Sequence, residues 1–265
     1  MAFARWALLV SALGVIGSFG ATLLAYPANP RVMRLGRNAA WALVLSSLLV
    51  IAAQLYAWFG IEGFTDPQNV WTMLSITLWG LHWTWLAGVA LGAAIVLSIA
   101  AAKPRVWIFA SGAAAAGVTA VVPLIGHGGV HDAVILLWHR VHVFGAGCWI
   151  GSLAVAAWSG RRDRPALLAS LRRFAPIAFT GSALIAISGV ALAWLHMRPL
   201  STFWTTDYGR VLMAKIAATL IVGALGFVNW RGPRMRVVIA EVTLALFVVL
   251  ALTAWLSGLE MPGGH

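Results

Sequence analysis

Apolar residues fill eight long runs along the chain, and short polar links separate the runs. A helix needs about 20 predominantly apolar residues to cross the hydrocarbon core of a bilayer. The runs that reach this length cover residues 6–26, 39–59, 71–98, 106–125, 134–158, 174–196, 210–230 and 237–256. The pattern predicts an all-α, polytopic membrane protein with eight transmembrane helices. We interpret residues 1–265 as a single transmembrane domain, because no link is long enough to separate two domains.

The composition agrees with a membrane protein and excludes an ordinary soluble domain. Of the 265 residues, 62% are hydrophobic and 9% are charged, whereas soluble domains carry about 25% charged residues. The net charge of +11 would suit nucleic acid, but the basic residues lie in short clusters between the apolar runs. We therefore expect the lipid bilayer, and no nucleic acid, as a partner. The first run is interpreted as a membrane helix, with a cleaved signal peptide as the alternative.

The basic clusters also predict an orientation. Cytoplasmic links of membrane proteins carry an excess of lysine and arginine. Most of the 18 basic residues lie in the links after the first, third, fifth and seventh helices, whereas most acidic residues lie on the other side. We predict that these links are cytoplasmic, that the N- and C-termini lie outside, and that the membrane is the bacterial inner membrane.

Tryptophans mark the ends of the predicted helices. The indole ring favours the membrane–water interface. The tryptophans near predicted helix ends, which we expect to form an interfacial belt, are Trp6, Trp41, Trp58, Trp71, Trp107, Trp138, Trp158, Trp194, Trp204, Trp230 and Trp255. The others, Trp79, Trp83, Trp85 and Trp149, lie deeper and need another explanation.

Histidines gather on the predicted outer side of the membrane. Those at outer helix ends, in outer links or in the outer tail are His127, His131, His139, His142, His196 and His265. His82 lies deeper, inside the third helix, and no histidine lies in a cytoplasmic link. Met73, Met197 and Met213 also fall at outer helix ends. Imidazole nitrogen suits copper, zinc and iron, and thioether sulfur favours Cu(I).

His139 and His142 are the strongest candidates for metal ligands. They are three residues apart, so they project from neighbouring positions on one face of a helix. Ionisable groups inside a bilayer are costly and usually mark a functional site. Taken singly, His131, His196 and His265 favour another interpretation, an imidazole at a helix end that hydrogen-bonds a carbonyl group or water.

Two further charges lie inside predicted helices. Lys215 lies near the outer end of the seventh helix, from which its stem can extend to the interface. Glu241 lies near the inner end of the eighth helix, within reach of Arg234 or Arg236. They sit at opposite faces of the membrane and cannot pair with each other, and we expect a structural role for each.

Several segments resemble the copper resistance D (CopD) family of bacterial inner-membrane proteins. They are GHGG at 126–129 followed by HRVHVFGAGCWIGSL, then LRRFAPIAFTGSALIAISGVALA, TTDYGRVLMAKIAATLIVGALGF and RVVIAEVTLALFVVLALTAWL. The resemblance is strongest over residues 123–256, and over the first four helices it is one of hydropathy and topology. Ser152 stands where the family's WxGG motif has its second glycine. The resemblance implies movement of copper from the periplasm across the inner membrane, with His127 and His142 as ligands.

Together these observations predict copper transport or copper handling across the inner membrane rather than an enzyme activity. Copper is expected near the periplasmic face on His142 and His127. The donors expected to help them are His139, His131, Met197 and Met213. A periplasmic copper chaperone is an expected partner. The cytoplasmic side offers no histidine and only Met33 and Met235, so the sequence supports an outer site better than a complete path.

Two alternatives stay open at this stage. A b-type cytochrome would hold haem b between His82 and His142, which come from different helices at similar predicted depth. An integral subunit or scaffold would use its histidines only as hydrogen-bonding groups. The visible spectrum and metal content of the purified protein distinguish these functions.

Overall fold

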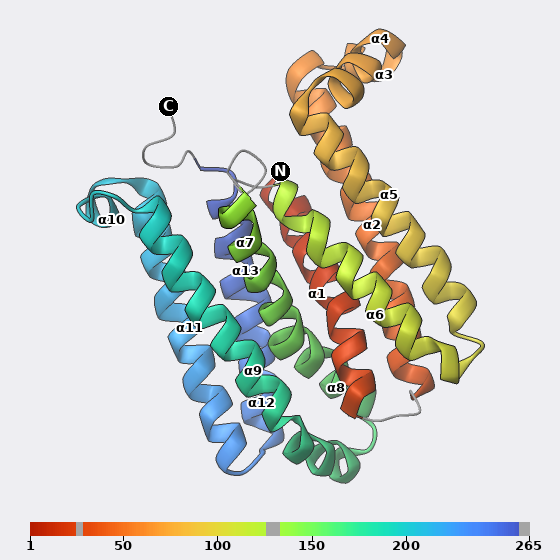
Figure 1. Cartoon of the computed structure of the whole chain (residues 1–265), viewed down its shortest axis with the longest axis vertical. Coiled ribbons are helices and arrows are strands. Elements are labelled where there is room, and N and C mark those ends of the chain that lie inside the picture. The colour runs from red at the N-terminus through yellow and green to blue at the C-terminus, as the bar shows by residue number, and fades with distance from the viewer. Residues whose placement is uncertain (25–28, 126–132, 260–265) are drawn as a thin grey trace.

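The fold is a bundle of long helices (Figure 1), in a computed structural model that describes residues 1–24, 29–125 and 133–259. The α-helices are α1 (Ala2–Leu24), α2 (Pro30–Phe59), α3 (Glu62–Thr65), α4 (Pro67–Trp71), α5 (Leu78–Ala100), α6 (Pro104–Val121), α7 (Ala133–Ala146), α8 (Ser152–Gly160), α9 (Arg164–His196), α10 (Thr202–Thr205), α11 (Asp207–Arg231), α12 (Met235–Thr243) and α13 (Leu250–Leu256). Short segments of other helix types are the π-helices η1 (Thr72–Ile76), η4 (Gly147–Gly151) and η5 (Leu244–Val249), and the 3-10 helix η2 (Val122–Ile125).

Eight helical spans within the described ranges are long and apolar enough to cross a membrane. The predicted all-α class and the number of spans are therefore confirmed. The fifth span joins α7, η4 and α8, and the eighth joins α12, η5 and α13.

Helices α2 and α5 begin several residues away from the starts that the apolar pattern indicates, because local caps decide where these helices start. The side chain of Asn29 accepts a hydrogen bond from the backbone of Arg31, and proline follows at the first helical position, so α2 begins before residue 39. Thr77 has an extended backbone (ψ 141°), and its hydroxyl caps Gly80, so α5 begins after residue 71.

Helix α1 lies between two halves of the bundle (Figure 1). The first half contains α2, α5 and α6, and the second half contains the helices from α7 to α13. Of its most apolar stretch, 61% is buried, against 11% in α9 and in α11. A Cβ atom at Gly17 would lie 2.1 Å from the carbonyl carbon of Gly151, and one at Gly147 would meet the side chain of Ile16. The small-xxx-small pair Gly147 and Gly151 predicts such a close helix contact, and α1 is the helix that makes it.

Each half has its own apolar core. The first core joins α1, α2, α5 and α6 around buried residues such as Trp83 and Trp107, and the second joins η4, α8, α9, α11 and α12 around Trp149 and Val222. The interfacial position expected for Trp107 is wrong. Its indole is fully buried and donates a hydrogen bond to the Thr22 hydroxyl at 3.0 Å, because that hydroxyl offers the acceptor that water would otherwise supply.

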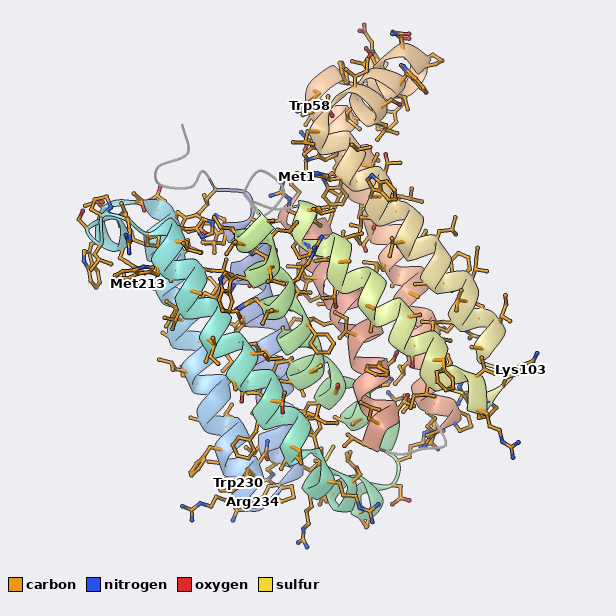
Figure 2. The ribbon with its side chains drawn as sticks, viewed as in Figure 1. Met1, Trp58, Lys103, Met213, Trp230 and Arg234 are labelled. Atoms are coloured by element: carbon orange, nitrogen blue, oxygen red, sulfur yellow. The ribbon has the colours of Figure 1, made fainter. Side chains whose placement is uncertain are left out.

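The two ends of the bundle differ in chemistry. We call the end that carries His139 and His196 the histidine end, and the end that carries the α8–α9 and α11–α12 links the arginine end. Figure 2 shows Met1 and Met213 at the histidine end, and Trp230 and Arg234 at the arginine end. The compartment that each end faces stays a prediction.

Candidate metal centre

His142 lies on α7 and faces α9. Its Nδ1 atom is 3.0 Å from the hydroxyl oxygen of Ser188. A Cβ atom at Gly189 would lie 3.6 Å from the His142 ring, so the imidazole rests directly against the α9 backbone. The polar group of α7 therefore points into the second half of the bundle.

The Ser188 hydroxyl fixes which nitrogen of His142 carries the proton. That hydroxyl donates to the carbonyl group of Leu184, one turn earlier on α9. Its oxygen is then left to accept, so Nδ1–H of His142 is the donor. The lone pair of the neutral imidazole lies on Nε2, which is the atom that can bind a metal ion.

Glycines bring α7 and α9 close enough for this contact. A Cβ atom at Gly145 would lie 2.9 Å from the carbonyl oxygen of Gly181, and one at Gly181 would lie 2.8 Å from that of Gly145. Gly145 follows His142 by less than one helical turn, so the close approach is made beside the imidazole.

His139 meets His196 from α9. Their ring centroids are 5.7 Å apart, with an angle of 58° between the planes. Nδ1 of His196 lies 2.8 Å from the Leu192 carbonyl oxygen. Because a carbonyl group can only accept, Nδ1 carries the proton and Nε2 carries the lone pair. The expected helix-end hydrogen bond of His196 is confirmed. The same bond leaves the lone pair of Nε2 available for a metal ion.

The two methionine candidates differ in burial. Met197 is fully buried at the end of α9, whereas Met213 on α11 is half-buried. His127, His131 and His265 lie outside the described residues. Within the described ranges, no group of three or more histidine, cysteine, aspartate or glutamate side chains could hold one metal ion.

Lys215 on α11 belongs to the surroundings of His142. Its ammonium group and His139 both act electrostatically on the imidazole of His142. Three helices, α7, α9 and α11, therefore contribute polar groups to this part of the histidine end. A cation bound there would meet the charge of Lys215.

Within the described part of the chain, Glu241 on α12 forms no ion pair with Arg234 or Arg236, although both arginines are near it in sequence. Its carboxylate accepts hydrogen bonds from Trp149 Nε1 at 3.1 Å and from Asn229 Nδ2 at 2.6 Å. Asn229 is reached across the α11–α12 turn. Arginines at a helix end extend their stems to the interface instead, which keeps the guanidinium in water.

The haem alternative gains no support from this geometry. His82 lies on α5, which packs against α2 and α6, whereas the imidazole of His142 turns toward α9. Bis-histidine haem needs both rings to face one iron.

Sequence reasoning missed Ser188 and Asn229 as partners. The available signal was a polar side chain inside an apolar span, as in ALIAISGVALA for Ser188 and GALGFVNW for Asn229. A polar side chain inside an apolar span can be recognised in the sequence, but the helix that supplies its partner cannot.

Comparisons with known proteins cover both halves of the bundle. Residues 1–138 match the model of the copper resistance protein D-like N-terminal domain, and residues 168–256 match the model of copper resistance protein D. The match therefore includes the first four helices, beyond the resemblance in hydropathy seen in the sequence. Copper transport protein CutJ of Bacillus subtilis (strain 168) is 28% identical over 120 residues, which cover 41% of this chain and 22% of that protein. No solved structure matches the chain significantly.

Proposed function

The chain belongs to the copper resistance protein D family, and from this membership we propose that it transports copper across the bacterial inner membrane. Copper, the cargo, binds at the histidine end. In the predicted orientation this end faces the periplasm, where a copper chaperone is the proposed donor. The similarity to a protein named for copper transport supports this function over an enzyme activity.

The proposal depends mainly on the hydrogen bond that orients the imidazole of His142 and leaves its Nε2 lone pair available. The hydroxyl oxygen of Ser188 accepts a hydrogen bond from Nδ1–H of the imidazole, so Nε2 presents its lone pair from inside the bundle. His139 and His196 supply a neighbouring pair of imidazoles at the same end of the bundle. Imidazole is a good copper ligand, and the buried thioether of Met197 at the same end suits Cu(I). His127, His131 and Met213 complete the proposed donor set.

The test compares two histidine variants in the purified protein. His142→Ala should lower copper affinity by more than the roughly 10–100-fold that loss of a supporting residue costs at a metal site. His82→Ala, on the other half of the bundle, should leave copper affinity unchanged. Copper binding is measured by competition with a chromogenic chelator.

The same samples test the haem alternative. The visible spectrum of the parent protein should lack a Soret band. A Soret band that disappears in His82→Ala would overturn the copper assignment in favour of a cytochrome. Equal, small losses of copper affinity in both variants would show that His142 is not a copper ligand.

A further inference from the structure

Glu241 is a buried carboxyl group that has no cationic partner among the residues that the structure describes. Its side chain is 1% exposed, and its two hydrogen-bond partners, Trp149 and Asn229, are neutral. Among the described residues no charged side chain acts on it from α8, α9, α11 or η5. A carboxylate buried in a membrane protein is costly unless it binds a cation or a proton.

The Asn229 amide can serve this carboxyl group in two protonation states. Nδ2 of Asn229 lies 2.6 Å from Oε2 of Glu241, so the amide and the carboxyl group are within hydrogen-bond distance. The amide oxygen Oδ1 is buried and accepts no hydrogen bond. A half-turn of the amide exchanges its oxygen and nitrogen. Asn229 then accepts from a protonated Glu241, whereas in the first orientation it donates to the ionised form.

A cavity of about 260 Å³ adjoins the carboxyl group. The side chains with polar atoms in its lining are Glu241, Asn229, Ser182, Trp149 and Trp230, and the other lining side chains are apolar. The volume is enough for several water molecules, and the polar groups offer them partners. Glu241 is the only charged side chain in the lining, within the part of the chain that the structure describes.

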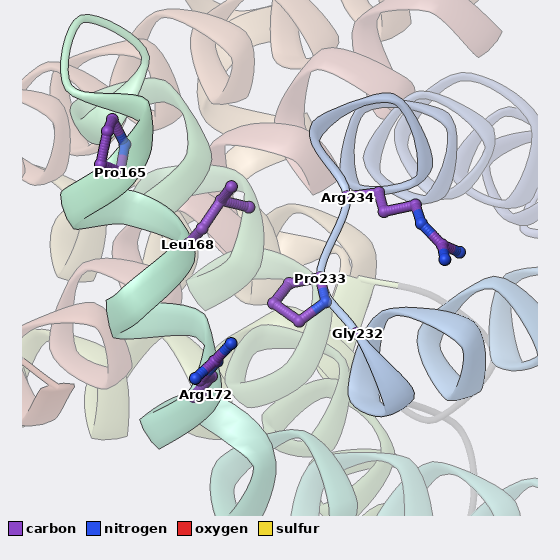
Figure 3. Close-up of a pocket in the computed structure, with 6 residues that line it drawn as sticks. All are labelled: Pro165, Leu168, Arg172, Gly232, Pro233 and Arg234. Atoms are coloured by element: carbon purple, nitrogen blue, oxygen red, sulfur yellow. The ribbon is translucent and has the colours of Figure 1, made fainter.

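The cavity leads to the arginine end. Pro233 lines this cavity and also lines a groove at the arginine end together with Arg172 and Arg234. Figure 3 shows Pro233 and Gly232 in this groove, between the α9 residues and Arg234. The guanidinium groups of Arg172 and Arg234 in this neighbouring groove repel a metal cation, whereas a proton can be passed along water molecules. The cavity lining, as described, also lacks the imidazole, thiol and thioether groups that copper prefers.

We propose that Glu241 is a proton-binding site open to the arginine end, and that it exchanges a proton as copper passes the histidine end. The coupling to copper rests on the proposed function; the proton site does not. The proton comes from solvent, forms an O–H bond with Oε2 of the carboxylate, and returns to solvent when that bond breaks. One positive charge enters and leaves the site, and no electron is transferred.

The first experiment asks whether the carboxyl group is protonated in the absence of copper. Infrared difference spectra of the full-length protein in lipid are recorded between mildly acidic and mildly alkaline pH. We expect the carbonyl-stretch band of a carboxylic acid shielded from water, which rises and falls with pH. Glu241→Gln should remove this band, and Glu62→Gln, outside the membrane spans, should leave it. A band unchanged in Glu241→Gln, or no such band at any pH, overturns the proton site.

A second variant keeps the test valid if Glu241→Gln does not fold. Asn229→Ala removes the amide but keeps the carboxyl group, so the band should persist at a shifted frequency. An unshifted band would overturn the role of Asn229.

The coupling is tested in proteoliposomes that contain a pH-sensitive dye. Copper(I) uptake by the parent protein should be accompanied by a proton signal, and Glu241→Gln should abolish that signal. Copper uptake without a proton signal overturns the coupling. A parent protein that moves no copper overturns the proposed function and the coupling together, while the infrared band alone decides the proton site.

Discussion

The second half of the bundle presents nitrogen donors at one end and oxygen atoms at the other. At the histidine end, the imidazoles of His139, His142 and His196 gather at α7 and α9. At the arginine end, the carboxylate of Glu241 and the amide of Asn229 lie beside a cavity. Soft or borderline cations such as copper favour the first set, and hard cations and protons favour the second. The two ends are therefore suited to different ions.

The same helices build both ends. The fifth span contributes His142 and Trp149, which are seven residues or about 10 Å apart along the helix. The π-helix η4 begins after His142 and contains Trp149, and such wide turns are frequent at functional sites. Helix α11 likewise carries Lys215 toward one end and Asn229 toward the other. A shift of either helix would be felt at both ends, which is the physical requirement for coupling two sites.

The largest expected effect concerns which compartment each end faces. A reporter fused at Arg164 should give a cytoplasmic signal, and one fused at the C-terminus should give a periplasmic signal. The reason is the concentration of lysine and arginine in the links at the arginine end. The outcome is all-or-none. Signals from one side in both fusions would contradict the three spans between Arg164 and the C-terminus, and exchanged signals would open the Glu241 cavity toward the periplasm.

Ser188→Ala tests whether copper binding at the histidine end depends on the hydrogen bond between His142 and Ser188. The variant removes the hydroxyl that accepts from Nδ1–H and leaves the ring with the backbone of Ile185 as its partner on α9, so copper affinity should fall by about 10–100-fold. Ser170→Ala is the matched control on α9, because its hydroxyl also donates to a carbonyl of its own helix. Affinity is measured by chelator competition. If both serine variants bind copper equally well, His142 needs no support from α9.

The outline of the fold was accessible from the sequence because each span buries about 20 apolar residues in lipid, a property of consecutive residues. The placement of His139 and His142 on one face of a helix could be predicted for the same reason, because it depends only on their spacing in the sequence. The partners of these groups were not accessible. Ser188 and Asn229 reach their partners across helix contacts, and which faces meet depends on close approaches such as Gly145 to Gly181.

Two side chains find partners that their neighbourhood in the sequence does not indicate. Glu241 lies near Arg234 and Arg236 in the sequence, yet its donors come from α11 and η4. Trp107 lies near a helix end, which favours the interface, yet Thr22 on α1 gives its indole a buried acceptor. In both cases a partner from a distant segment replaced water or a neighbour in the chain.

Trp149→Phe tests the charge at the arginine end. The variant keeps most of the aromatic surface but removes the N–H that donates to Glu241. Hydrogen bonds to charged groups contribute about 1.5–3 kcal/mol, against about 0.5–1.5 kcal/mol for neutral ones. At mildly alkaline pH, where Glu241 is expected to be ionised, we therefore expect a larger loss of unfolding free energy than in Trp6→Phe, whose indole donates to the neutral carbonyl of Leu246. Denaturant titration in detergent measures both, and equal losses would show that Glu241 is uncharged under those conditions.

The smallest expected effect has the opposite sign and concerns Lys215. Its ammonium group acts on His142, so it repels a copper ion bound to that imidazole. Lys215→Met removes the charge while keeping a long apolar side chain, and copper affinity should rise by about threefold to tenfold, as expected for a partly screened charge. Lys215→Arg keeps the charge and should bind copper like the parent protein. Chelator competition detects a change of this size. An increase in Lys215→Met alone would place the bound ion within reach of α11, whereas unchanged affinity would place it farther out, toward His139 and His196.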